Sequence, residues 1–574
     1  MSWESHLSKP WQRKITRRTM LRGTGLALGA AVVGGGLTGC GGGASPTAQP
    51  QAMTTSTVSS EKRKPGGTWC YNYGSQMPNL HPQTGFSENI RYVHGRLLVF
   101  DYVKGEVHME LAESVENPDP LTYIIKIKPT AKFQQIAPVN GRAVTSTDVA
   151  VSWTNYRDNP RTFNKSILTD FVDHYETPDQ STLVIKMKIP TAYALDAEGF
   201  ANATTCTVVP TELFDQNLLE KTAIGCGGYV LEQFDPTSIA SFKRRPDGWF
   251  TPELPYIDRT VWYVITDTAA AMAAFKAKQI DFIYPRDKLA AEEISGYDPA
   301  ITGGLWYNSY PWMLYMRADK PEGMFWDVRV REAVYNALNI DELIEKVDLG
   351  NGERTGPIPV NLEPYRLPAD EVKAIFPYNP AKAKELLSAA GWDSNLEVPF
   401  KYVNGPLYEV FATQLQKQLA AVGIKIKLIP QDLYTVWVPE TMGKKDFQMC
   451  GGPYIANYIT PDSWIRMRSS NGLGTGNFCR WSDPEMDDIA KKQQVEFDTE
   501  KRKVLIMEAQ RLMIKKFVPN VNLWTQKINA RWWPYYHPVL ATMGYWGYYS
   551  HYDWIDVDNP HYPKEERLKK FGPV

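Results

Sequence analysis

The chain has 574 residues, of which 63 are Lys or Arg and 64 are Asp or Glu, and it is 12% aromatic. Its length exceeds the about 250–300 residues that one hydrophobic core supports, so we expect two or more lobes. The balanced charge argues against a protein that binds nucleic acid or an acidic lipid surface.

The amino-terminal segment up to Cys40 has the organisation of a secretory signal. Two adjacent arginines, Arg17 and Arg18, precede an apolar run of small residues that ends in Leu-Thr-Gly-Cys at Cys40. A basic region, an apolar core and small residues before a cleavage point define such a signal. Residues 23–38 number only 16 and include six glycines, whereas a membrane span needs about 20 apolar residues.

The signal has two recognisable motifs. Thr-Arg-Arg-Thr-Met-Leu-Arg, around Arg17 and Arg18, resembles a twin-arginine export signal, which is read by a receptor and is not an anchor. Leu-Thr-Gly-Cys resembles a bacterial lipobox, which implies that Cys40 becomes the lipid-modified first residue of the mature chain. We therefore expect residues 1–39 to be a signal peptide and the protein to be anchored at the extracytoplasmic face of the cell membrane.

Residues 40–65 predict a flexible linker, because they are rich in Gly, Ser, Thr and Pro and contain almost no large apolar side chain. Five cysteines remain after Cys40, so at least one thiol stays free in an exported chain that can form disulfides. The pairing remains open, although two pairs are close in sequence: Cys206 with Cys226, and Cys450 with Cys479, while Cys70 stands apart.

Strand and helix patterns alternate from about residue 66 onwards. Thr145 or Ser146 is a suitable cap for a helix that begins there, with Asp148 in its first turn. Alternating apolar residues predict strands, and apolar residues at helical spacing predict helices. The strands include 68–73, 121–127 and 424–429, and the helices include 268–278, 327–346, 380–390 and 408–422. This alternation predicts an α/β fold.

Several blocks of sequence, in one order, carry a resemblance. They include Asn79-Leu80-His81-Pro82, Ala143-Val144-Thr145-Ser146-Thr147-Asp148-Val149, Asp327-Val328-Arg329-Val330-Arg331-Glu332-Ala333 and Tyr378-Asn379-Pro380-Ala381. Together they resemble the extracytoplasmic solute-binding proteins of the peptide/nickel class (family 5), which include the oligopeptide- and dipeptide-binding proteins of ABC importers. The resemblance implies a monomeric partner of an ABC permease in the membrane.

The resemblance also implies the architecture: an α/β, two-lobed periplasmic-binding-protein-like fold in its large three-domain form, with a ligand cleft between the lobes. Lobe closure around a ligand is a hinge motion, and we expect the hinges near residues 310–317 and 526–531. The expected domains are domain I at 66–106, 224–314 and 528–574, domain II at 107–223, and domain III at 315–527.

A loop in domain III is the expected ligand contact. In the peptide-binding members the pattern Trp-x-Ala-Asp-Tyr-x-x-Pro holds the ligand, and its aspartate meets the peptide ammonium. Here Tyr454 begins the matching segment, Asn457 replaces the aspartate, and Tyr458 follows. An asparagine carries no charge to balance an ammonium. Asp462 either supplies the missing carboxylate or caps the helix that begins at Ser463.

Four further aromatic residues are candidates for ligand contact, with core packing as the alternative for each tryptophan. They are Phe86, Trp249, Trp437 and Trp524. An aromatic-rich cleft without the ammonium-binding acid would also suit an oligosaccharide, because sugar faces stack on Trp and Tyr. The primary hypothesis is therefore a peptide-class solute, and the alternative is a solute like a cello-oligosaccharide.

Signatures of catalysis are missing from the sequence. It contains no Gly-x-Ser-x-Gly, His-Glu-x-x-His or Walker A motif. The eight histidines are scattered without the spacing of zinc ligands. We therefore expect no enzymatic activity, no cofactor and no metal, with a secreted hydrolase as the less favoured alternative.

The substitution Asn457→Asp tests the role of the segment that begins at Tyr454. If the cleft is otherwise of the peptide type, we expect a higher affinity for peptides with a free amino terminus, because a carboxylate balances the ammonium charge. Calorimetric titration of both proteins with the same peptides measures the difference. An unchanged affinity would mean that the cleft was built for another kind of solute.

Overall fold

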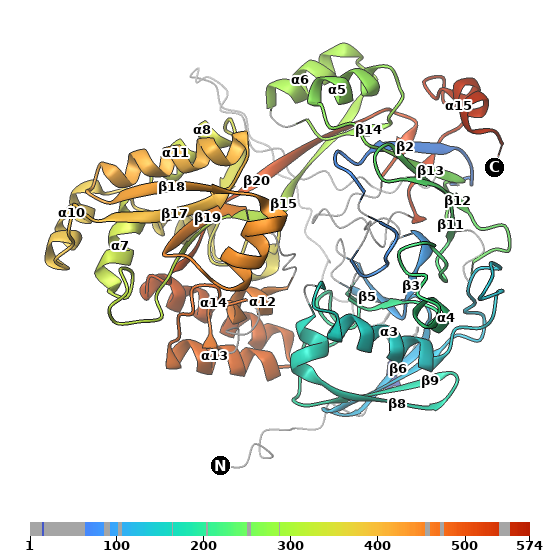
Figure 1. Cartoon of the computed structure of the whole chain (residues 1–574), viewed down its shortest axis with the longest axis horizontal. Helices are drawn as coiled ribbons and strands as arrows, with labels where there is room; N and C mark the ends of the chain where they lie inside the picture. Colours follow the sequence, from blue (N-terminus) through green and yellow to red (C-terminus); the bar gives the residue numbers. More distant parts are fainter. Residues whose placement is uncertain are drawn as a thin grey trace, which may run out of the picture.

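The computed structural model shows a mixed α/β protein (Figure 1). It describes residues 14–15, 63–77, 79–84, 92–101, 106–162, 165–202, 205–249, 254–285, 288–453, 460–470, 476–538 and 551–573. Arg17, Arg18, Cys40 and most of the linker lie outside the described residues, so the predictions made for them stay predictions. Among the residues described, no helix combines the length and the apolar character required to cross a bilayer.

A mixed eleven-stranded sheet runs through both lobes. Its strand order is β11-β12-β13-β2-β14-β20-β15-β19-β17-β18, and β16 pairs with β20. The strands on one side are β2 (Thr68–Asn72), β11 (Tyr229–Asp235), β12 (Ile239–Arg244), β13 (Arg259–Tyr263) and β14 (Phe282–Ile283). Those on the other are β16 (Gly352–Arg354), β17 (Glu397–Val403), β18 (Lys425–Gln431) and β19 (Met449–Pro453).

Two long antiparallel strands, β15 (Thr302–Met316) and β20 (Asn520–Trp532), join the two sides of the sheet, as Figure 1 shows. Their register runs from Thr302 opposite Trp532 to Tyr315 opposite Asn520. The ladder is irregular between Tyr307 and Pro311, where several residues of β15 face a single residue of β20. The residue pairs before this irregularity belong to one lobe, and those after it belong to the other.

A second, five-stranded sheet of order β1-β6-β7-β9-β8 forms a separate unit. Its strands are β1 (Lys14–Ile15), β6 (Ala112–Asp119), β7 (Thr122–Ile127), β8 (Val172–Asp179) and β9 (Thr182–Met187). The helical elements nearby are α3 (Ser146–Asp158), η2 (Ile167–Phe171) and α4 (Thr211–Asp215).

Short strand pairs complete the sheets. They are β3 (Gly95–Arg96) with β10 (Thr207–Val208), β4 (Leu98–Asp101) with β5 (Glu106–Met109), and β21 (Tyr536–His537) with β22 (Trp554–Ile555). The lobe that contains β2 also carries α5 (Thr268–Lys276), α6 (Lys288–Tyr297) and α15 (Lys564–Phe571).

The lobe that contains β17 has helical elements on both faces of its sheet (Figure 1). One set comprises α7 (Val328–Ala337), α8 (Ile340–Val347), α9 (Ala369–Ala374), α10 (Pro380–Ala389) and α11 (Pro406–Ala420). The other comprises α12 (Pro461–Arg466), α13 (Pro484–Val495) and α14 (Thr499–Lys515). Two further elements are η3 (Glu363–Tyr365) and η4 (Leu433–Gly443).

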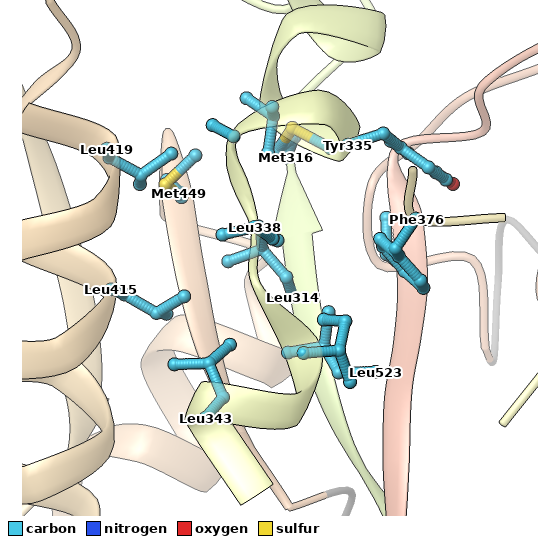
Figure 2. Packing of buried hydrophobic residues seen from close by; sticks show 14 of the residues in the cluster. Leu314, Met316, Tyr335, Leu338, Leu343, Phe376, Leu415, Leu419, Met449 and Leu523 are labelled. Atoms are coloured by element: carbon cyan, nitrogen blue, oxygen red, sulfur yellow. The ribbon is translucent and has the colours of Figure 1, made fainter. Parts of the chain in front are cut away.

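Alternation along β15 divides this lobe into two cores. Leu314 and Met316 join a cluster with α7, α8, α10 and α11, whereas Met313 and Tyr315 join a cluster with α12–α14. Successive side chains of a strand point to opposite faces, so one strand supplies both cores. Figure 2 shows the first cluster, with Leu338, Leu415 and Leu419 directed toward β15 and β19.

The remaining buried clusters belong to the two other units. One cluster draws on residues from Leu97 to Cys226, around the five-stranded sheet. The other combines β2, β12 and β14 with Ala530, Trp533 and residues up to Tyr562 near the carboxyl terminus. Three bodies with their own cores therefore exist in one chain.

Two sequence expectations about helices can be compared directly. Thr145 caps α3 as expected: its side chain accepts a hydrogen bond from the amide of Asp148, whose side chain binds the Thr145 amide in return. The single helix expected at 327–346 is wrong, because α7 ends at Ala337 and α8 starts at Ile340. Asn339 is the cause, since its side chain caps α8 by accepting from the Glu342 amide.

The five described cysteines are all free and buried, so neither sequence-near pair forms a disulfide in this structure. Burial raises the pKa of the Cys206 and Cys479 thiols, which therefore remain protonated at neutral pH. These cysteines act as small apolar core residues here.

A buried ion pair fastens the carboxyl-terminal helix α15 to the core. The Arg567 Nη2 atom lies 2.7 Å from Asp281 Oδ1. The Asp281 carboxylate also accepts hydrogen bonds from the Cys70 amide at 2.6 Å and the Tyr535 hydroxyl at 2.6 Å. Asp281 thus connects β2, the start of β14 and α15.

The substitution Arg567→Met tests this connection. We expect it to lower the free energy of unfolding by about 3–5 kcal/mol, because it leaves the buried Asp281 carboxylate without its counter-charge. Chemical denaturation measures the loss. Lys569→Met is the matched control on the exposed face of α15 and should have little effect; equal losses in both variants would contradict the assignment.

Candidate functional site

The lobes meet along an interface that we call the interlobe seam. It consists of Asp170 and residues 191–202 on one side, and of Thr460 with α12, α13 and α14 on the other. In Figure 1 the orange helices α12–α14 lie next to the unit that carries α3 and β8. The seam joins segments that are almost 300 residues apart, so its geometry depends on the tertiary fold alone.

The charged contacts of the seam all have their carboxylate on the same side. Arg466 Nη2 lies 2.8 Å from Asp170 Oδ2, and Arg502 Nη2 lies 3.7 Å from Asp196 Oδ2. In addition, the backbone amide of Thr460 donates to Glu198 Oε1 at 2.9 Å. Residues 170–198 therefore supply carboxylates, and the facing helices supply the guanidinium groups and the amide.

Backbone and apolar contacts accompany the ion pairs. The Ala192 amide donates to the Gln494 carbonyl oxygen at 2.8 Å. Ala197 is fully buried in the cluster formed by Trp464, Ile465 and other residues of the facing helices. The Arg466 guanidinium lies 4.9 Å from the centre of the Phe171 ring, which adds a cation–π contact. The lobes are thus in direct contact.

Asp462 lies within the seam and is 2% exposed. It is the second residue of α12, but the N-cap residue is Thr460, and Asp462 accepts a hydrogen bond from Gln493 Nε2 instead. Arg466 Nη1 stands 4.0 Å from Asp462 Oδ2. Burial raises the pKa of Asp462, and the nearby positive charge of Arg466 opposes this effect.

The tryptophan candidates have distinct environments. Trp524 and Trp437 are buried in cores, and Trp524 donates to Asp348 Oδ2 at 2.6 Å while stacking on Trp312. Trp249 is half-buried, donates to the Cys226 carbonyl oxygen at 3.0 Å and stacks on His551. None of these three side chains belongs to the described seam. The other candidates lie outside the described residues: Phe86, Tyr454, Asn457 and Tyr458.

The irregularity between β15 and β20 coincides with a polar cluster. The Tyr307 hydroxyl donates to Glu353 Oε2 on β16, and Glu353 also lies 3.3 Å from Arg366 and 3.8 Å from Lys527. A cavity of about 440 Å³ lies nearby among α8, β16 and α9, rather than in the seam. Charged side chains that line this cavity form ion pairs with one another. For example, Arg354 Nε lies 2.6 Å from Asp341 Oδ1.

Sequence reasoning named only Asp462 among the charged residues of the seam. Asp170, Asp196, Arg466 and Arg502 were missed, because a single charged residue gives no sequence signal for a partner hundreds of residues away. The one usable signal was Arg466, which follows Asp462 by one helical turn. Within the described parts of the chain, no group of three His, Cys, Asp or Glu could hold a metal ion.

The crossing strands, the separate cores and the seam define the two-lobed α/β architecture of extracytoplasmic solute-binding proteins. The family model described as "Bacterial extracellular solute-binding proteins, family 5 Middle" matches residues 106–475. This match spans more than half of the chain, and the protein belongs to this family.

Relatives and solved structures agree with this membership. Di/tripeptide-binding protein 1 of Pseudomonas aeruginosa (strain UCBPP-PA14) is 23% identical over 500 residues, which cover 82% of this chain and 89% of that protein. The periplasmic binding protein DppA of Helicobacter pylori, in complex with the peptide STSA, has a TM-score of 0.72 at 18% identity and covers 86% of this chain and 99% of its own. AgaA of A. tumefaciens R10, in complex with agropinic acid, has a TM-score of 0.71 at 21% identity, with coverages of 86% and 100%.

The substitution Asp170→Asn tests the seam. We expect it to shift the equilibrium between the closed and open arrangements of the lobes toward the open one, because Arg466 loses a partly buried partner. The shift should be about 1–2 kcal/mol, which is a roughly five- to thirtyfold change in the equilibrium constant. Small-angle X-ray scattering should then give a larger radius of gyration. Asp173→Asn, at an exposed position of β8, is the control; equal radii for all three proteins would contradict the role of the ion pair.

Proposed function

We propose that the protein captures a peptide-class solute between its lobes and delivers it unchanged to an ABC permease. The observation that carries this proposal is the family membership together with a seam that lies between two lobes joined by β15 and β20. The Pseudomonas aeruginosa relative is named for di- and tripeptides, and the Helicobacter pylori structure contains a peptide.

The lobes suit a closing motion. Each has its own hydrophobic core, so each moves as a rigid body, and the irregular part of the β15–β20 ladder is the natural place for bending. This place adjoins the expected hinges at residues 310–317 and 526–531. The division into domains I, II and III, with the bounds given above, belongs to the same proposal and is supported by the three separate bodies.

The cellular location is also proposed. Arg17 and Arg18 would direct export, and a lipid on Cys40 would hold the mature chain at the outer face of the cell membrane. A single acyl chain binds a membrane only weakly, so firm anchoring needs more than one chain on this cysteine. The linker at 40–65 would let the lobes move in solution near the permease, with a reach of about 30 Å.

An oligosaccharide is the second candidate solute. Asn457 removes the acid that the peptide-binding pattern carries, and the chain holds 18 Trp and 31 Tyr, whose flat faces suit sugar rings. A similar fold holds a non-peptide solute, since the AgaA structure contains agropinic acid. Catalysis is not part of either candidate function.

A thermal-shift screen of the full-length protein separates the two candidates. Peptides of two to six residues and cello-oligosaccharides are compared, and we expect stabilisation by peptides. A solute at 100 times its dissociation constant should add about 2.7 kcal/mol to the free energy of unfolding, because it binds only the folded state. Stabilisation by cello-oligosaccharides alone would reject the peptide proposal, and an unrelated sugar such as sucrose serves as the control.

A further inference from the structure

The segment that follows α8 lies against β20 beside the irregular part of the β15–β20 ladder. We call residues 348–354 the hinge strap. Its last three residues are β16, which pairs with residues 524–526 of β20. The register of β20 with β15 jumps at the same place, between Thr525 and Lys527. The hinge strap therefore lies along the part of β20 where the lobes would bend.

One end of the hinge strap is fixed to the lobe that contains β17. It follows α8, which packs into the core of that lobe through Leu343 and Val347. The Asp348 carboxylate accepts hydrogen bonds from the indole nitrogens of Trp312 at 3.0 Å and Trp524 at 2.6 Å. Both indoles belong to the same core and stack on each other. This end therefore moves with that lobe.

Asn351 connects the hinge strap to the other lobe. Its side-chain amide donates to the Lys527 carbonyl oxygen at 2.5 Å, and its own carbonyl oxygen accepts from the Lys527 amide at 2.9 Å. Its Oδ1 atom also accepts from Asn529 Nδ2 at 3.0 Å. Lys527 and Asn529 flank Ile528, which packs against the core of the lobe that contains β2. The hydrogen bonds of Asn351 thus reach across the hinge.

Glu353 makes a second connection of this kind. Its carboxylate accepts a hydrogen bond from the hydroxyl of Tyr307, on the β2 side of the hinge, and lies 3.3 Å from Arg366 Nη1. Arg366 belongs to the lobe that contains β17, because the carbonyl oxygen of the preceding Tyr365 accepts a hydrogen bond from Gln510 of α14. Two side chains of the hinge strap therefore contact groups on both sides of the hinge.

These contacts join two bodies that move separately when the lobes bend. Each lobe has its own core, so a bend changes the distances between groups on opposite sides of the hinge. Hydrogen bonds weaken steeply when their distance or angle departs from the preferred values. The contacts of Asn351 and Glu353 are formed in the arrangement in which Arg466 meets Asp170 across the seam. Bending away from this arrangement would weaken them.

We propose that the hinge strap favours the closed arrangement of the lobes, with Asn351 as a positioning residue that acts through β20. The inference deepens the proposed function and rests on its closing motion, but not on the identity of the solute. The closed arrangement is then stabilised at two separate places, the seam and the hinge strap.

The test measures how often the seam opens in Asn351→Ala, by hydrogen exchange of the full-length protein without solute. The backbone amides of Ala192 and Thr460 donate hydrogen bonds across the seam, so their exchange requires that the lobes separate. We expect both amides to exchange about three- to thirtyfold faster, because two buried hydrogen bonds across the hinge are lost. Mass spectrometry of the exchanged protein gives the rates.

Gln418→Ala is the matched control. Gln418 is a buried amide, 6% exposed like Asn351, and its side chain bridges the backbone amide and carbonyl of Asn339 within one lobe. Its loss should lower the thermal stability to a similar extent but leave the exchange of the seam amides at the wild-type rate. If Asn351→Ala does not fold, Asn529→Ala removes one of the same hydrogen bonds from the other lobe and should accelerate the exchange about two- to tenfold.

The outcomes separate the two proposals. Wild-type exchange of the seam amides in the hinge-strap variant, or an equal acceleration in Gln418→Ala, would overturn the role of the hinge strap while the peptide function stands. A protein that no peptide stabilises would overturn the proposed function. The exchange rates would still show whether the hinge strap favours closed lobes, because they are measured without solute.

Discussion

The hydrogen-bonded pair of β15 and β20 is the constraint on which the rest of the structure depends. Because these strands belong to one continuous sheet, the lobes remain joined whatever their relative angle. The ladder has its largest irregularity between Tyr307 and Pro311 and a smaller one between Trp312 and Met313, so bending costs least in this part of the pair. The cluster around Glu353 contacts both strands there, through Tyr307 and Lys527.

The seam has the chemistry of an interface that can open. The cores within the lobes are apolar and large, whereas the seam relies on ion pairs, a few backbone hydrogen bonds and the small side chain of Ala197. Contacts between domains that move are typically more polar than permanent interfaces, because exposed charges are readily hydrated. The polar seam is therefore of the kind that lobes which move relative to each other form.

Asp462 shows the polar character of the seam. Its carboxylate is buried, accepts a hydrogen bond from Gln493 and lies 4.0 Å from Arg466, which is nearer to Asp170. The contact between the lobes therefore includes the cost of burying an incompletely paired charge.

The sequence by itself determined the α/β class, the family and the local features encoded by neighbouring residues, such as the cap of α3 by Thr145. The helix break at Asn339 was also local, but apolar spacing concealed it because the same pattern continues on both sides. Only the tertiary structure decided that Asp170 meets Arg466, that Asp462 turns to Gln493 instead of capping α12, and that Trp524 binds Asp348 in a core. Propensity and periodicity act over a few residues, whereas these contacts join segments tens to hundreds of residues apart, whose proximity depends on the packing of the whole chain.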